Sequence, residues 1–170
     1  HSTVTNPLEC THDWMVAMHG RQSVDVTHVH SSRPLDTVVH SKLIYKLNNY
    51  GITGSLLKWI ETFLSDRLQC VVSEYCSSNW SSVLSGVPQG SVLGPILFIV
   101  YIGNVGEICT GTGNVTHCLY ADDLKLYSTI KFKSDHDSVS LQSALNRLEV
   151  WCREWQLSIN INKCHVLHLG

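Results

Sequence analysis

Two adjacent carboxylates, Asp122 and Asp123, lie between two largely apolar runs, residues 115–120 and 124–130. Neighbouring side chains on a regular strand point to opposite faces, so both carboxylates reach one point only where the backbone turns. The segment therefore predicts a β-hairpin with acid at its tip. Two such carboxylates repel each other unless a cation lies between them, and paired oxygen ligands favour Mg²⁺ or Mn²⁺. An ordinary polar turn, in which Asp is also common, stays open as the alternative.

A second segment, residues 85–95, reads Ser-Gly-Val-Pro-Gln-Gly-Ser-Val-Leu-Gly-Pro and predicts a loop that opens into an apolar helix. Pro95 suits the first turn of that helix, where its missing N–H costs nothing. Gln89 offers an amide in the loop. A flat or phosphorylated ligand can approach the bare backbone at three glycines, Gly86, Gly90 and Gly94. Without the hairpin, the ordinary start of a helix is the simpler interpretation.

Together the two segments resemble the reverse transcriptase domain of retrotransposons that lack long terminal repeats. Residues 85–98 match the nucleotide-and-template loop of that family, and residues 119–128 are similar to its metal-binding hairpin. The resemblance covers nearly the whole chain. It implies an α+β polymerase palm, a ferredoxin-like sheet with helices packed on one face, together with part of the fingers. Further similar pieces follow in the expected order, at residues 35–40, 56–60, 151–152 and 157–163.

The resemblance also implies a function, that of an RNA-directed DNA polymerase. Such an enzyme extends a DNA primer along an RNA template with deoxynucleoside triphosphates, by two-metal nucleotidyl transfer with two Mg²⁺ ions, Mn²⁺ being an alternative. The lysine near the leaving pyrophosphate would stabilise developing charge there, and a plain surface lysine is the other interpretation. The implied residues are Asp122, Asp123 and Lys163 for catalysis, Asp122, Asp123 and His30 for metal binding, and Leu35, Gln89 and Gly90 for nucleotide binding.

The chain departs from the family at position 30. The first metal-binding Asp of the family ends a strand six residues before the Asp matched by Asp36, and His30 stands in its place. Imidazole is a poorer ligand for Mg²⁺ than a carboxylate is, although it serves Mn²⁺ and softer ions. Asp25 lies five positions away, on the other face of the strand. We therefore expect a copy that is inactive or nearly so with Mg²⁺. The alternatives are a non-catalytic, nucleic-acid-binding remnant and a decayed product without function.

Composition fits one folded domain but not a strong nucleic-acid binder. The 170 residues are 44% hydrophobic and 15% charged, which argues against disorder. The net charge of -2 predicts weak affinity for a template, because polyanion binders usually carry a basic stripe. The chain starts at His1 and its last apolar run reaches the final residues, so we expect residues 1–170 to be a partial domain, palm plus part of the fingers, that lacks a thumb and an endonuclease.

Cysteine usage and hydropathy suggest an intracellular protein that does not enter a membrane. The seven cysteines form no C-x-x-C pair, so neither a disulfide framework nor a zinc ribbon is indicated. The longest apolar run, residues 92–102, is too short to span a bilayer, and no secretory signal is visible. Nucleus or cytoplasm, and the oligomeric state, stay open. A zinc site is an alternative use of three neighbouring side chains, Cys164, His165 and His168.

The pattern of apolar residues predicts alternating helices and strands. Asp36 is expected to cap the first helix. An apolar stripe at spacings of four, three, four and three defines the longest helix through Leu141, Leu145, Leu148, Cys152 and Trp155. The expected helices cover residues 37–49, 55–64, 95–105 and about 137–155, and the expected strands cover residues 24–29, 69–75, 157–161 and 164–169, in addition to the acidic hairpin.

Overall fold

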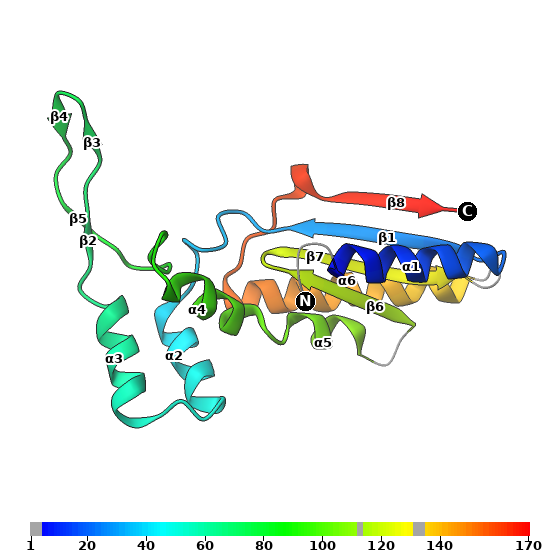
Figure 1. Ribbon diagram of the computed structural model, residues 1–170, viewed down its shortest axis with the longest axis horizontal. Helices are drawn as coiled ribbons and strands as arrows, with labels where there is room; N and C mark the ends of the chain where they lie inside the picture. Colours follow the sequence, from blue (N-terminus) through cyan, green and yellow to red (C-terminus); the bar gives the residue numbers. More distant parts are fainter. Residues whose placement is uncertain (1–4, 112–113, 131–134) are drawn as a thin grey trace. The chain divides into compact units, whose positions relative to one another are not determined.

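The computed structural model describes residues 5–111, 114–130 and 135–170. The chain forms two compact units, one made of residues 1–32 and 103–170 and the other of residues 33–102. The first unit is built on a β-sheet, and the second consists of helices and a slender two-stranded ribbon (Figure 1).

The sheet unit has four antiparallel strands in the order β6-β7-β1-β8. Strand β1 runs from Ser23 to His30 and pairs with β7 along its whole length, with Ser23 opposite Ile130 and His30 opposite Asp123. On its other side β1 pairs with β8. The remaining strands are β6 (Val115–Tyr120), β7 (Asp123–Ile130) and β8 (His165–Leu169). The predicted strand at residues 24–29 and the predicted hairpin are thereby confirmed.

Helices cover both faces of this sheet. Helix α1 (Thr5–His19) packs Cys10 and Ala17 against Val24, Val26 and Tyr127, which share one face. Helix α5 (Val105–Thr110) and helix α6 (Asp135–Trp155) contact the other face, where the ring of His117 abuts Gly106. The predicted α+β palm is confirmed, but its helices pack on both faces of the sheet and not on one face as predicted. Helix α1, on the face opposite α5 and α6, is an element that the apolar pattern does not predict.

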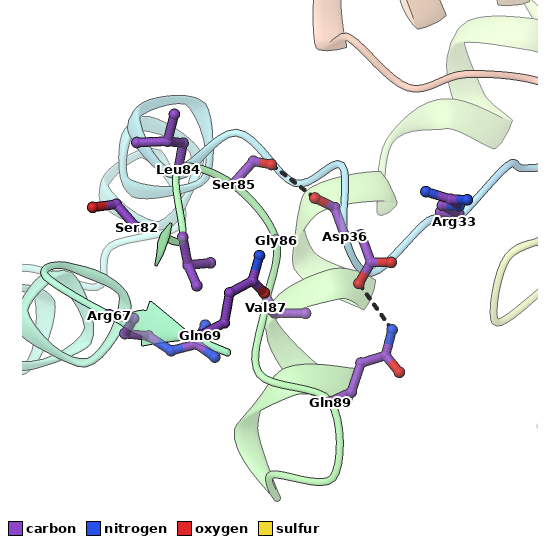
Figure 2. A pocket seen from close by; sticks show the side chains of 11 residues that line it. Arg33, Asp36, Arg67, Gln69, Ser82, Leu84, Ser85, Gly86, Val87 and Gln89 are labelled. Atoms are coloured by element: carbon purple, nitrogen blue, oxygen red, sulfur yellow. Dashed lines mark hydrogen bonds between the residues drawn. The ribbon is translucent and has the colours of Figure 1, made fainter. Parts of the chain in front are cut away.

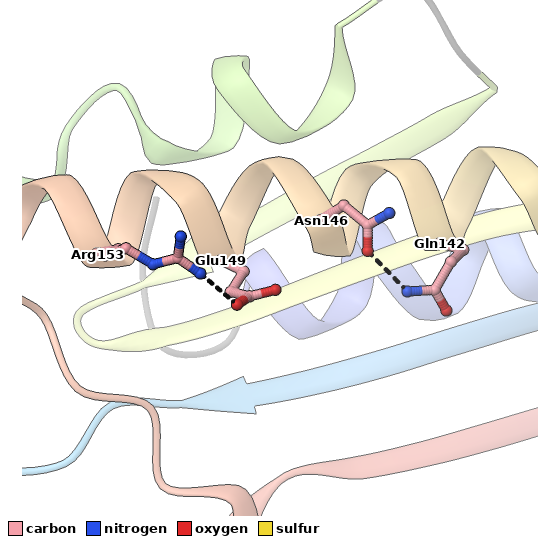
Figure 3. Close-up of polar contacts among 4 residues, drawn as sticks. All are labelled: Gln142, Asn146, Glu149 and Arg153. Carbon is pink, nitrogen blue, oxygen red and sulfur yellow. Dashed lines mark hydrogen bonds and ion pairs between the residues drawn. The ribbon is translucent and has the colours of Figure 1, made fainter.

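Helix α6 confirms the predicted apolar stripe and adds to it. Leu141, Leu148 and Cys152 are buried as expected, and Ala144 and Trp151 are buried beside them. The solvent side carries two polar pairs one turn apart, Gln142 with Asn146 at 2.9 Å and Glu149 with Arg153 at 2.8 Å (Figure 3). Pairs with this spacing stabilise an exposed helix by about 0.2–0.5 kcal/mol each.

The second unit contains three helices, α2 (His40–Asn49), α3 (Gly54–Leu64) and α4 (Leu93–Ile102). Between α3 and α4 the chain makes a narrow ribbon (Figure 1). The single strand predicted at residues 69–75 is wrong. Because the ribbon packs no core face, its strands are only two residues each: β2 (Leu68–Gln69) with β5 (Ser81–Ser82), and β3 (Val72–Ser73) with β4 (Cys76–Ser77), all exposed.

Three predicted boundaries are also wrong. The first helix begins at His40, after Val39, and its start has no side-chain cap, so Asp36 is not the capping residue. The predicted strand at 157–161 is reduced to one bridge, Ser31 with Ile159, followed by the 3₁₀ turn η1 (Ile161–Lys163). The helix predicted at residues 95–105 ends at Ile102, because Gly103 and Asn104 interrupt it before α5.

One stretch, Leu93–Thr110, has the length and composition of a membrane span, with a mean hydropathy of 1.5 over its 18 residues. It comprises α4 and α5, and 44% of it is buried inside the protein. Buried helices of soluble domains pass the same test of length and composition. The stretch is therefore weak evidence for contact with a membrane.

Candidate active site

The acidic hairpin has a tight two-residue turn. Tyr120 pairs with Asp123, and Ala121 and Asp122 form the turn between them. The φ angle of Ala121 is 50°, in the left-handed region that a residue with a Cβ adopts only at a cost. Left-handed backbone at a functional turn is a known form of stored strain. The predicted hairpin with acid at its tip is therefore confirmed, with Asp122 in the turn and Asp123 at the start of β7.

Asp123 is bonded to His30. The two residues are register partners at the end of β1 and the start of β7, so their side chains share one face of the sheet. Nδ1 of His30 lies 2.5 Å from Oδ1 of Asp123, and the side chains are 30% and 48% exposed. The Nδ1–H group donates to the carboxylate. The structure thus joins position 30 to the acidic turn, as the resemblance implies, but through a hydrogen bond between the two side chains.

Asp122 is next to Asp123 in the chain, and Lys163 lies on a distant segment that is hydrogen-bonded to the end of β1. Asp122 is half-buried within the turn itself, one residue before Asp123. Lys163 ends η1 and is exposed, and the backbone of this segment is fixed to the end of β1 by the bond from Asn160 N to His30 O at 2.9 Å. The sheet unit therefore holds the implied metal-binding and catalytic residues on neighbouring segments.

These side chains do not fit two Mg²⁺ ions. Among the residues that the structure describes, no group of three or more His, Cys, Asp or Glu side chains is arranged to hold a metal ion. The donor set also suits Mg²⁺ poorly, because imidazole replaces one carboxylate and its N–H donates to an oxygen of another. Mg²⁺ requires near-octahedral oxygen coordination, which one free carboxylate and one hydrogen-bonded carboxylate do not supply.

The three side chains considered for zinc have other partners or lie apart. Cys164 Sγ donates to the carbonyl oxygen of Asn160, and Nδ1 of His168 lies 2.6 Å from Oδ1 of Asp25. His165 and His168 are three residues apart on β8 and so point to opposite faces. The described part of the chain therefore gives no support to a zinc site.

A histidine neighbour changes the electrostatics of the face that carries His30. His28 lies two residues before His30, opposite Lys125 on β7 and His165 on β8. Burial lowers the pKa of His28 below its ordinary 6.5, and the positive charges of Lys125, His30 and His165 lower it further. His28 is therefore neutral at physiological pH.

In the second unit, the glycine-punctuated loop is bound to the chain around Asp36. Gly86 N donates to Val38 O and Val87 N to Leu35 O, both at 2.8 Å. At Gly86, φ is 87° and a Cβ would lie 2.8 Å from the Cα of Asp36. The space beside the Gly86 backbone is therefore occupied by the protein's own chain and not available to a ligand. Gly90 has a φ of 80° and nothing near its Cβ position, so its backbone is uncovered, and its contact with a ligand stays a prediction.

Gln89 lines a polar pocket of about 580 Å³ in this unit (Figure 2). Its amide Nε2 donates to Oδ1 of Asp36 at 2.9 Å, so Asp36 orients the glutamine. Sequence analysis missed the pocket's two cationic residues, Arg33 and Arg67, because they lie outside the matching motifs. Their charges and the exposed amides suit an anionic, hydrogen-bonding ligand. Leu35 and Gly90 lie next to lining residues in the chain but do not line the pocket.

Comparison with known proteins gives a consistent result. Residues 17–169 match the family described as "Reverse transcriptase (RNA-dependent DNA polymerase)". The RNA-directed DNA polymerase from mobile element jockey of Drosophila funebris is 32% identical over 133 residues, which are 76% of this chain and 14% of that protein. The probable RNA-directed DNA polymerase from transposon BS of Drosophila melanogaster is 27% identical and covers 98% of this chain, 19% of its own length. The chain thus spans less than a fifth of these relatives.

Solved structures share the fold at low identity. Apo telomerase from Candida tropicalis, truncated from its C-terminal domain, superposes with a TM-score of 0.73 at 11% identity, over 99% of this chain and 36% of that one. Telomerase from Candida albicans in complex with a fragment of telomeric RNA gives 0.72 at 13%, over 98% and 30%. With the acidic hairpin, the glycine loop and a family match over nearly its whole length, this chain belongs to the reverse transcriptase (RNA-dependent DNA polymerase) family.

Proposed function

We propose that this segment is the palm and part of the fingers of the RNA-directed DNA polymerase of a retroelement, and that nucleotidyl transfer by this copy is impaired with Mg²⁺. The family match and the named relatives support the first part. The substrates of the whole protein would be an RNA template, a DNA primer and deoxynucleoside triphosphates, and it would act inside the cell.

The His30–Asp123 hydrogen bond is the observation that carries the proposed impairment. Reverse transcriptases generally use divalent metal ions. In two-metal transfer, such ions activate the attacking hydroxyl and stabilise the leaving oxygen. Here one carboxylate of the acidic turn already accepts a hydrogen bond from an imidazole N–H at 2.5 Å. A metal ion would have to displace this bond and would still lack the carboxylate that His30 replaces.

The second unit would supply the nucleotide contacts. Gln89, held by Asp36, presents an amide in a pocket that also contains Arg33 and Arg67. Guanidinium groups bind phosphate oxygens through paired hydrogen bonds, and an amide reads a sugar or base edge. We assign Gln89, with Leu35 and Gly90 beside the pocket, to nucleotide binding, and Lys163 to the leaving pyrophosphate.

Primer extension on an RNA template tests the proposal, with this segment carried in a full-length polymerase. We expect little synthesis with Mg²⁺ from the unmodified chain, and a gain of at least about tenfold from His30→Asp, because the variant restores the third carboxylate. His28→Asp is the matched control, since it adds a carboxylate to the same strand and face opposite Lys125 instead of Asp123. Robust Mg²⁺-dependent synthesis by the unmodified chain would defeat the impairment.

A second candidate function is nucleic-acid binding without catalysis. The pocket with Arg33 and Arg67 favours it, because phosphate contacts survive the loss of a metal site. A salt-dependent shift of a labelled template-primer, with no nucleotide incorporated by the chain or by His30→Asp, would support this candidate over the first.

A further inference from the structure

Two cysteines from distant parts of the chain meet between α1 and the sheet. Cys10 lies on α1, is 1% exposed and belongs to the buried cluster with Val24, Val26 and Tyr127. Cys118 lies on β6 and packs against the same cluster. The register of β6 on β7 and of β7 on β1 puts Cys118 on the sheet face that α1 covers. The two thiols are therefore neighbours in the fold, although 108 positions separate them in the sequence.

The thiols contact each other and border an opening. A hydrogen bond joins the Cys10 and Cys118 side chains. Both line a pocket of about 320 Å³, together with Glu9, Asp13 and Thr116. Cys118 is only partly buried, so a small molecule in this pocket can reach its sulfur before it reaches that of Cys10.

We propose that Cys10 and Cys118 form a redox modification site, at which a low-molecular-weight disulfide oxidises both thiols to a disulfide bond that ties α1 to β6. The thiolate of Cys118 attacks one sulfur of the small disulfide, forms a mixed disulfide and releases one small thiol. Cys10 then loses its proton to solvent and attacks the sulfur of Cys118, and the second small thiol leaves. The protein loses two electrons and two protons, and the small disulfide becomes two thiols.

The surroundings set the order of the two steps. Burial raises the pKa of the Cys10 thiol to about 12, and the hydrogen bond to Cys118 raises it as well. Cys10 is therefore the slower, resolving thiol. Lys125 lies opposite Cys118 in the register, and its charge offsets part of the rise in the pKa of Cys10.

Other cysteines of the chain provide contrasts. Cys109 on α5 and Cys152 on α6 are both buried, and burial raises the pKa of these thiols to about 11 and about 12. Neither borders the pocket that gives access to Cys118. Cys76 on the ribbon is exposed. Oxidation should therefore select Cys10 and Cys118 over the buried pair, and Cys76 should give only a mixed disulfide.

The experiment uses oxidised glutathione as the probe on the folded chain at pH 8, followed by alkylation of free thiols, non-reducing digestion and mass spectrometry. We expect a linked peptide containing Cys10 and Cys118, lighter by two hydrogens than the reduced pair. It should be absent from Cys118→Ser and unchanged in Cys76→Ser. The oxidised chain should unfold at higher urea than the reduced chain, and a phosphine reductant should abolish the difference.

Two outcomes would overturn the proposal. One is stable glutathione on Cys118 with Cys10 still free to alkylate after unfolding, and the other is a linked peptide that joins a different pair. Cys10→Ala serves as a second variant, because the buried position tolerates a small apolar side chain better than the hydroxyl of a serine. With Cys10→Ala, glutathione should remain on Cys118.

Discussion

At the scale of single residues, the His30 imidazole determines what the acidic turn can bind. A carboxylate at this register position would face Asp123 and repel it, so the pair would need a cation. The imidazole instead donates a hydrogen bond to Asp123 and removes that need. We therefore expect His30 to suit the folded protein and to weaken the affinity of the turn for divalent metal. A loss of metal binding here need not reduce stability.

Lys46 is a second residue whose chemistry the fold alters. Its side chain is 6% exposed, and Nζ donates to the carbonyl oxygen of Tyr101 at 2.6 Å. Burial lowers its pKa from the ordinary 10.5 to about 8. Between pH 8 and pH 10.5, the Lys46 amine is deprotonated in the folded chain but protonated in the unfolded chain. The contribution of Lys46 to the free energy of unfolding therefore rises with pH across this range.

We predict that Lys46→Met removes this rise. Relative to the variant, the wild-type chain should gain about 3 kcal/mol of unfolding free energy between pH 8 and pH 10.5, since one pKa unit corresponds to about 1.4 kcal/mol. Urea unfolding of both chains across that range measures the gain. The difference between the chains is the readout, because buried thiols and Tyr127, whose pKa values are raised, lower stability in both chains as pH rises. Parallel curves would contradict the assignment.

At the scale of elements, the loop around Gly86 depends on a close approach of two backbones. Gly86→Ala should destabilise the second unit by about 1–3 kcal/mol, because its Cβ would press on Asp36 and Leu35 in a left-handed conformation. Gly90→Ala is the matched control, with a similar φ but open space around its Cβ position. It should cost about 1 kcal/mol. Urea midpoints compare the two, and equal losses would show that strain alone, without a clash, accounts for the effect.

Sequence patterns predicted the elements whose partners lie nearby in the chain. The hairpin at Tyr120–Asp123 and the stripe on α6 follow from local periodicity, and both are confirmed. Helix α1 was not predicted because it has no wide apolar face. Its apolar side chains are not gathered on the buried side, since Leu8, Met15 and Val16 are exposed. The role of Asp36 was wrong for a related reason. Its partner, Gln89, is 53 residues away, and no local pattern distinguishes a cap from a long-range acceptor.

In the candidate active site too, some features could be predicted from the sequence and others depend on the fold. The family resemblance placed position 30 beside the acidic turn, and the strand register confirms that placement. It could not predict that His30 would bond to Asp123, because this depends on the side chain that departs from the family. Arg33 and Arg67 lie in no motif, and only the fold gathers them around one pocket. The roles of Leu35, Gly90, Asp122 and Lys163 remain predictions.

At the scale of the whole molecule, charge limits what the chain does with nucleic acid. The net charge of -2 gives no general attraction for phosphates, so binding should depend on the few cations of the second unit. We predict weak, salt-dependent binding of single-stranded RNA. Replacing Arg33 and Arg67 by Gln should reduce the slope of log K against log salt by about 1.4, or about 0.7 per lost contact.

Fluorescence anisotropy of a labelled oligonucleotide measures that slope. Lys58→Gln, an exposed cation on α3 outside the pocket, is the control and should leave the slope nearly unchanged. If Lys58→Gln reduced the slope as much as the replacement of Arg33 and Arg67 does, the phosphates would bind elsewhere on the molecule.

We propose above that the imidazole of His30 keeps divalent metal from the acidic turn. Magnesium binding, measured by isothermal titration calorimetry, tests it without any requirement for polymerase activity. The wild-type chain should bind Mg²⁺ at least about tenfold more weakly than His30→Asp, which corresponds to about 1.4 kcal/mol. Equal affinity of the two chains, lost in both when Asp122 and Asp123 are replaced by Asn, would contradict the claim.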